Sequence, residues 1–205
     1  SLDRSLSERW EVALLGALMA QAQAVYERGE HARATNYYQQ ARARAEARHD
    51  APGLVSAYQG LADTAYRLGD LAGAARLYAE ARTRAEAAGL VRERAAAEWG
   101  LGFVALWQGH HGAAHAHFEA QRTLSEAAGD RLGLARAHNA LGEVARLTDA
   151  TAEREYRRSL SIHDAIGSTG TLVTRLANEA EARAVAGQEK AVRILHVDGA
   201  TSVRD

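Results

Sequence analysis

Amphipathic helix-forming stretches recur along this sequence at a fixed spacing, and glycines mark that spacing. Gly29, Gly69 and Gly109 stand 40 residues apart, and each is followed nine residues later by an aromatic residue. A shortened fourth copy follows, with Tyr156 in the aromatic place. A helix pair that recurs in this way is typical of a solenoid, because no single pair can bury its apolar face alone. The pattern therefore predicts an all-α solenoid of four helix pairs plus a C-terminal capping helix.

The turns between the stretches set the expected boundaries. We expect one domain over residues 1–205, with the segments listed here: repeats at about 7–50, 51–89, 90–129 and 130–167, a cap at 168–196 and a tail at 197–205. Ser5 and Glu8 form a capping-box pattern, which predicts that the first helix begins there. Pro52 suits the first turn of the third helix. Small residues such as Ala62 are expected to let two helices approach closely, with the next aromatic beside them.

Composition and charge exclude several classes of function. The chain contains no cysteine, so disulfides, thiolate metal sites and a cysteine nucleophile are ruled out. A formal net charge of −1 provides no field that would attract nucleic acid or an anionic membrane. We find no membrane-length apolar run and no signal peptide, and we expect a cytoplasmic protein. Arginine supplies nearly all the positive charge, Lys190 being the only lysine, which favours a bacterial source. Because the sequence begins with Ser1, we expect it to be part of a longer protein.

The repeat resembles a known family. The residues that carry the resemblance are Leu61, Ala62, Gly69, Asp70, Ala74, Tyr78 and Ala81. Their pattern resembles the tetratricopeptide repeat (TPR), in the longer variant found in kinesin light chains and in bacterial TPR-containing transcriptional regulators. The resemblance covers roughly residues 7–196. It implies a right-handed α-solenoid that acts as a scaffold or sensor by binding a partner on its concave face.

One aromatic stripe is the main candidate for that face. Trp99, Phe103, Leu106 and Trp107 follow the i, i+4, i+7, i+8 spacing of a single helix side. By family register these positions line the concave groove, together with polar residues of the neighbouring repeats: Gln59, Asp63 and Tyr66 before, and Arg136, Asn139, Glu143 and Arg146 after. We expect this groove to bind a protein or peptide segment, or a small effector. Two alternatives stay open. The stripe is buried in a homodimer, or it fills an inner seam of the solenoid.

A histidine cluster offers a weaker, metal-binding alternative. His111 and His115 stand at i, i+4 and could share a helix side, as two zinc ligands would. His111, however, occupies the register of the apolar Leu71, and no third ligand stands at a suitable spacing. We therefore expect no metal and no cofactor. The sequence also has no phosphate-binding glycine loop and no nucleophile–base pattern, so we expect no enzyme activity.

Overall fold

The computed structural model describes residues 2–148 and 152–166, and this part of the chain forms eight α-helices and no strand. In order they are α1 (Leu2–Glu27), α2 (His31–Ala47), α3 (Ala51–Arg67), α4 (Leu71–Ala87), α5 (Val91–Trp107), α6 (His111–Ala127), α7 (Arg131–Thr148) and α8 (Ala152–Ala165). The predicted all-α repeat fold of four helix pairs is confirmed. The predicted cap at 168–196 and tail at 197–205 lie outside the described residues.

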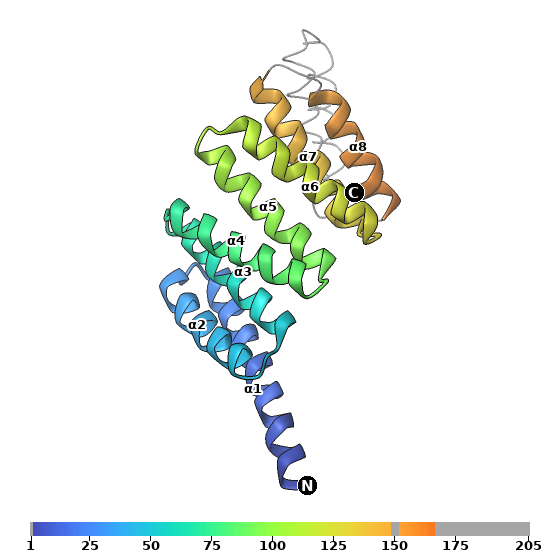
Figure 1. The fold of residues 1–205 in the computed structure, drawn as a ribbon. Coiled ribbons are helices and arrows are strands. Elements are labelled where there is room, and N and C mark those ends of the chain that lie inside the picture. Colours follow the sequence, from blue (N-terminus) through green and yellow to red (C-terminus); the bar gives the residue numbers. More distant parts are fainter. Residues whose placement is uncertain (1, 149–151, 167–205) are drawn as a thin grey trace, which may run out of the picture. The chain divides into compact units, whose positions relative to one another are not determined.

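The chain divides into two compact units, which we describe separately. Unit 1 spans Ser1–Gln108 and contains α1 to α5, and unit 2 spans Gly109–Asp205 and contains α6 to α8 (Figure 1). Within each unit, every helix packs against the next one along the chain. The expectation of one domain over the whole chain stays a prediction.

Unit 1 has two layers of helices. Besides its contacts with α2 and α4, α3 also contacts α1 and α5 directly. The odd-numbered helices α1, α3 and α5 therefore form a continuous layer, which we call the A layer, and α2 and α4 pack against one side of it. Its other side, the A-layer face, is the side on which the sequence predicted a groove.

Local sequence explains where most helices begin and end. Gly29 and Gly69 have positive φ angles of 80° and 84°, so each supplies the left-handed backbone of a turn between two helices. The Asp50 carboxylate accepts a hydrogen bond of 3.0 Å from the Gly53 N–H, capping α3, and proline follows in the first turn as predicted. The prediction for the first helix is wrong. It begins at Leu2, so Ser5 lies inside α1.

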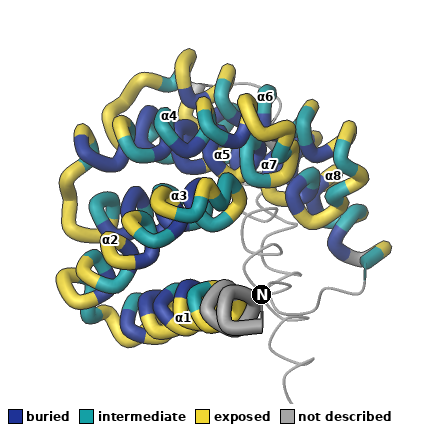
Figure 2. The backbone as a smooth tube through the Cα atoms, turned by 60° about the horizontal axis from the view of Figure 1, so that its bottom comes forward, coloured by how far each residue is buried: buried dark blue, intermediate teal, exposed yellow. Residues whose placement is uncertain are grey.

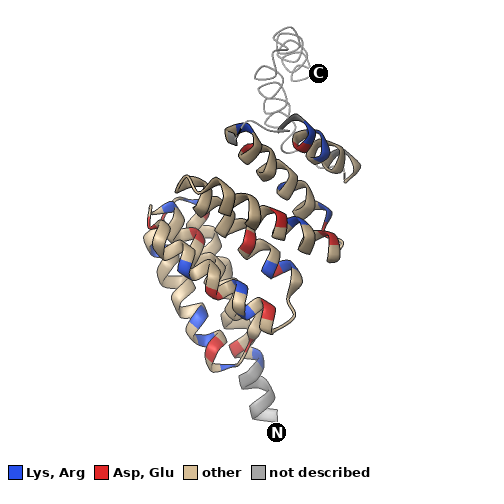
Figure 3. Ribbon diagram, turned by 45° about the horizontal axis from the view of Figure 1, so that its top comes forward, with Lys and Arg blue, Asp and Glu red and all other residues tan. Residues whose placement is uncertain are grey.

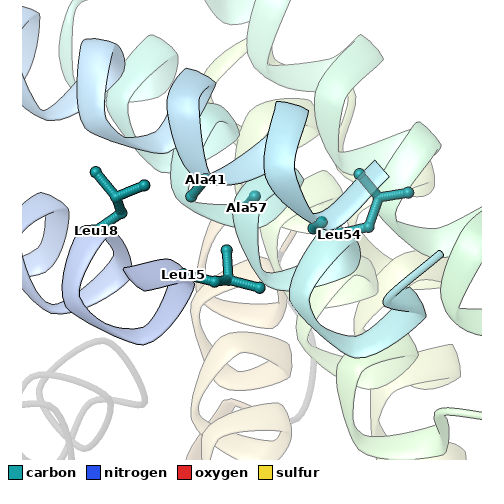
Figure 4. Close-up of a cluster of buried hydrophobic side chains, with 6 residues drawn as sticks. Leu15, Leu18, Ala41, Leu54 and Ala57 are labelled. Carbon is teal, nitrogen blue, oxygen red and sulfur yellow. The ribbon is translucent and has the colours of Figure 1, made fainter. Parts of the chain in front are cut away.

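Alanine, leucine and the ring of one aromatic per repeat fill the core. Figure 4 shows Leu15 and Leu18 of α1 in one cluster with Ala41 of α2 and with Leu54 and Ala57 of α3. In the next repeat Tyr78 packs in a cluster with Ala62, as the sequence predicted, and with Leu101 of α5. Buried residues form the stripes along which these helices meet, and exposed residues lie on their outer sides (Figure 2).

Candidate functional site

The predicted aromatic stripe lies on α5, in unit 1, and part of it is open to solvent. Trp107 is 69% exposed and Trp99 is 37% exposed, whereas Phe103 and Leu106 are half-buried. The rings of Trp99 and Phe103 meet edge to face, with centroids 4.7 Å apart and an interplanar angle of 61°. This is a favourable aromatic geometry. The stripe therefore combines half-buried side chains, Phe103 and Leu106, with the exposed indole of Trp107.

A ladder of side-chain contacts links the C-terminal ends of the A-layer helices. The Arg67 guanidinium of α3 donates from Nε to the Tyr26 hydroxyl of α1, at 3.0 Å. One repeat further, burial raises the pKa of Tyr66 of α3, while the charge of Arg67 and the interaction with the Trp107 side chain of α5 lower it, and the net direction is upward. Both pairs join residues 41 positions apart, so a contact between these positions recurs in successive repeats.

Tyr26 is a surface residue that the sequence analysis missed. It stands 40 residues before Tyr66, and that spacing was the available signal. The hydrogen bond also affects ionisation. The contact with Tyr26 is the main cause that raises the pKa of Arg67 above its usual value, so the guanidinium stays charged at any physiological pH. The A-layer face thus carries a fixed positive charge beside two tyrosines.

The polar residues predicted to flank the stripe in unit 1 hold helices together. The Gln59 amide of α3 donates a 2.7 Å hydrogen bond to the Glu93 backbone carbonyl of α5. The Asp63 carboxylate accepts a hydrogen bond from the Tyr78 hydroxyl of α4. Burial raises the pKa of Asp63, while the Tyr78 hydrogen bond and the nearby Arg67 charge lower it, and the net direction is upward. Both side chains are half-buried.

The other predicted groove residues belong to α7, in unit 2. Glu143 accepts a 2.8 Å hydrogen bond from the Tyr156 hydroxyl of α8 and pairs with Arg146, at 3.1 Å from Nη2. Asn139 is half-buried and Arg136 is exposed. Each set of predicted residues is placed within its own unit. A groove that unites the two sets stays a prediction.

A tyrosine–acceptor pair recurs between the two helices of a repeat, and repeat 3 departs from it. The pairs are Tyr38 with Gln23 Oε1 at 3.1 Å, Tyr78 with Asp63, and Tyr156 with Glu143. At the two corresponding positions repeat 3 has Phe103 and Phe118. Neither phenylalanine side chain has a polar atom, so no hydrogen-bonding group is left unsatisfied at these two positions. The change makes this stretch of α5 more apolar than the equivalent part of α3.

The histidines of α6 occupy packing and surface positions. His111 is half-buried, as its apolar register predicted. His117 is also half-buried, and His115 is exposed. Across the residues that the structure describes, no three histidine, aspartate or glutamate side chains form a group that could hold a metal ion. None of the described helices has the length and hydropathy needed to cross a bilayer. Acidic and basic residues are interspersed along the helices of both units (Figure 3).

Comparison with known proteins adds information on the fold. No protein-family model matches the sequence, and no curated protein matches it. Among solved structures, BtubC (BKLC) from P. vanneervenii is similar with a TM-score of 0.81 at 19% identity, over 98% of this chain and 85% of that one. A putative kinesin light chain with TPR-like repeats from P. anserina has a TM-score of 0.66 at 18% identity, over 93% and 97% of the two chains.

Rap proteins are also similar in structure. A Rap protein in complex with the competence and sporulation factor has a TM-score of 0.79 at 14% identity, over 92% of this chain. The chain spans 54% of the length of that Rap protein, and 56% of RapI. At these identities the likeness shows the fold alone. The fold is therefore a TPR-like helical repeat, the class that the sequence pattern predicted.

Proposed function

We propose that the A-layer face of unit 1 binds a protein or peptide segment. The observation that carries the proposal is Trp107, a large apolar side chain that is 69% exposed although it interacts with the Tyr66 side chain. An anchored aromatic loses little side-chain entropy when a partner covers it, so binding costs less than it would for a freely rotating side chain. Tryptophan is also among the residues that contribute most to protein interfaces.

The chemistry around Trp107 defines the class of ligand. Trp99 supplies a second, partly exposed ring on the same helix, and Arg67 and Tyr66 supply polar groups at the edge. A segment with one or two large apolar side chains could contact the two rings, and a carboxylate or backbone carbonyl nearby could bind the polar groups at their edge. One protein of similar fold supports a peptide ligand, the Rap conjugation gene regulator of the plasmid pLS20, whose structure is a complex with the Phr* peptide. In the full protein, we propose, this module is a cytoplasmic sensor or scaffold that regulates a further bacterial domain without catalysing a reaction.

The test is a binding selection followed by matched substitutions. Peptides would be selected on the wild-type protein from a random displayed library and then measured one at a time in solution by titration calorimetry. Trp107→Ala should weaken a selected peptide by about 2 kcal/mol or more, roughly 30-fold, because a central aromatic anchor is lost. Trp10→Ala is the control. Trp10 is 74% exposed on α1, away from the A-layer face, and its loss should leave the affinity unchanged.

Four outcomes would contradict the proposal or redirect it. A library that yields no binder, or binders that hold equally well to Trp107→Ala, would refute binding at this face. A small effector that competes with the peptides would change the ligand and keep the site. A wild-type dimer that Trp107→Ala converts to a monomer in light scattering would instead support the homodimer alternative, with the stripe as its interface.

A further inference from the structure

The first helix carries an exposed apolar stripe on a side that no other described helix of unit 1 covers. α1 lies at the edge of unit 1, with α2 and α3 packed against it from one direction (Figure 2). Its buried residues, among them Leu15, Leu18 and Val25, face that direction. On another side lie Trp10, 74% exposed, and Leu14, 39% exposed. Small and polar residues complete this second side, which we call the α1 stripe: Trp10, Ala13, Leu14, Ala17, Ala20, Gln21 and Ala24, all exposed.

The α1 stripe has the register of a surface that is buried elsewhere in the same unit. Forty residues after Leu14 and Ala17 come Leu54 and Ala57 of α3, which are buried with two alanines of α2, Ala41 and Ala45 (Figure 4). Ala97 of α5 holds the same register as Ala17, and it is buried in a cluster that includes Ala81 and Ala85 of α4. In each case a helix that offers an i, i+4 pair of alanines covers this face. The α1 stripe is therefore an inter-repeat packing face without its covering helix.

A preceding repeat that is connected to α1 by a tight turn, as α2 is connected to α3, cannot supply the covering helix. In unit 1 the covering helices α2 and α4 end in tight turns, directly before α3 begins at Ala51 and α5 begins at Val91. The corresponding start in the first repeat is Glu11. There α1 is already helical, because it runs without interruption from Leu2. The residues that would form the turn are part of a helix. A helix that covers the α1 stripe therefore has to be connected in another way, and the simplest possibility is that it belongs to a second chain.

We propose that the occupant is a second copy of this chain, whose α1 packs antiparallel to the first across the α1 stripe. An antiparallel pair centred on Ala17 places Trp10 opposite the partner's Ala24, because both lie seven residues from the centre. Leu14 falls opposite the partner's Ala20 by the same count, because both lie three residues from the centre. Each large side chain thus meets a small or flexible one, and the central alanines allow the helices to approach closely. α1 also offers the i, i+4 alanine pairs Ala13–Ala17 and Ala20–Ala24, which the covering helices use.

The first experiment measures the oligomeric state of the full chain by sedimentation and light scattering. The wild type should show twice the chain mass of 22.0 kDa at concentrations of about 10–100 µM, above a micromolar Kd. Leu14→Glu and Ala17→Glu should each give a monomer of unchanged helicity, because both side chains are exposed in one chain. Val12→Glu is the matched control. Val12 is a 57% exposed apolar residue of α1 that lies off the stripe, and its variant should stay dimeric.

A second experiment tests the antiparallel arrangement. Because the chain has no cysteine, single cysteines report on one position each. Ala17→Cys lies at the centre of the pair and should cross-link to its partner with a short bifunctional maleimide. In Ala24→Cys the two thiols should lie about 21 Å apart along the helices, from 14 residues at about 1.5 Å each, and should not cross-link. Equal cross-linking of both variants would overturn the antiparallel pairing.

The outcomes separate this inference from the proposed peptide binding. A wild type that stays monomeric at the highest concentration, or a dimer that Val12→Glu disrupts as strongly as Leu14→Glu, would overturn the α1 pairing. Neither result would affect peptide binding at Trp107, which lies on another surface. A dimer that Trp107→Ala disrupts while Leu14→Glu leaves it intact would also overturn the α1 pairing, and would place the interface on the aromatic stripe.

Discussion

Gly60 and Gly100 lie where a tyrosine ring of the preceding helix touches the backbone of the next. A Cβ atom at Gly60 would overlap the ring of Tyr38, and one at Gly100 would overlap the ring of Tyr78. Tyr78 is only 4% exposed and its hydroxyl is hydrogen-bonded to Asp63, so its ring has little freedom to move aside. Glycine is therefore required here by the close approach of two helices.

Gly100→Ala should destabilise the protein although alanine is the better helix former. The gain in helix propensity is about 1 kcal/mol, whereas overpacking a buried contact costs about 1–3 kcal/mol. Gly112→Ala is the control. Gly112 is helical in α6, and no atom would come within 4 Å of an added Cβ, so this variant should be neutral or slightly more stable. Urea denaturation of the two variants checks the prediction, and a stabilised Gly100→Ala would contradict it.

For single residues, the sequence predicted the positions of turns better than it predicted which side chains contact each other. The spacing of Gly29 and Gly69 was enough to predict turns, because only local backbone geometry is involved. The ladder from Arg67 to Tyr26 was not predictable in the same way. It depends on how two helices are rotated against each other, and a change of one residue turns a side chain by about 100° around its helix.

At the scale of elements, the hairpin of α7 and α8 contains a buried histidine–glutamate pair. His138 Nδ1 and Glu155 Oε2 are 2.8 Å apart, and the two residues are 6% and 8% exposed. Burial by itself raises the pKa of Glu155. Hydrogen bonds from His138 and Arg154, with the charges of His138 and Arg158, lower it, and the net direction is below its ordinary value of 4.5. The ionised carboxylate is therefore the form that the fold stabilises.

The pH dependence follows from that sign. A carboxyl group whose pKa is lower in the folded state stabilises the fold above its unfolded pKa, and this contribution is lost as the pH falls through the folded pKa. Glu155→Gln should therefore cost about 1–3 kcal/mol at neutral pH and less below pH 4.5. Thermal melts of both proteins across this pH range measure the difference. Glu119→Gln removes a partly exposed pair with Arg122 and should cost less than about 1 kcal/mol. A difference between wild type and Glu155→Gln that does not change with pH would contradict the assignment.

The helices themselves were largely predictable, and the exception is α1. Turn glycines, Asp50 and Pro52 stop and start helices through local effects that a sequence displays directly. The capping-box pattern at Ser5 and Glu8 was misleading because nothing before it stops a helix. No glycine or proline occurs among residues 1–10, and a serine inside a helix costs only a few tenths of a kcal/mol relative to alanine. The longer helix removes the turn that a preceding repeat would need.

For the whole molecule, periodicity predicted the class of fold, and the candidate surface was predicted less completely. The aromatic residues were found because Trp99, Phe103 and Trp107 follow the spacing of a single helix side. The flanking residues Gln59 and Asp63 were expected to face a ligand, and the structure shows that they bind other helices. A polar side chain at a groove position looks the same in a sequence whether it serves the ligand or the fold. Only the positions of Glu93 and Tyr78 in space distinguish the two roles.

A solenoid is stabilised by contacts between neighbouring repeats, and that property predicts how a defect in its middle spreads. Leu101 of α5 is 8% exposed and packs with Ala62 and Tyr78, so it joins the second repeat to the third within unit 1. Leu101→Asp removes this packing and buries an unpaired charge, which should cost about 4 kcal/mol or more. Because each repeat is stabilised mainly by its neighbours, the loss should be local. Hydrogen exchange should show early loss of protection in α4 and α5, while α7 and α8 keep theirs, and the thermal melt should broaden into two steps.

The control for this defect is Leu68→Asp, at a 59% exposed leucine that follows α3 in the same unit. It introduces the same charge without burying it, and it should shift stability by no more than about 0.5 kcal/mol. If Leu101→Asp melts like the wild type, the assignment of the core face of α5 is wrong. If all helices instead lose protection together, the chain unfolds as one cooperative body. Nearest-neighbour contacts would then be insufficient to describe its stability, and the expected single domain over residues 1–205 would gain its first direct support.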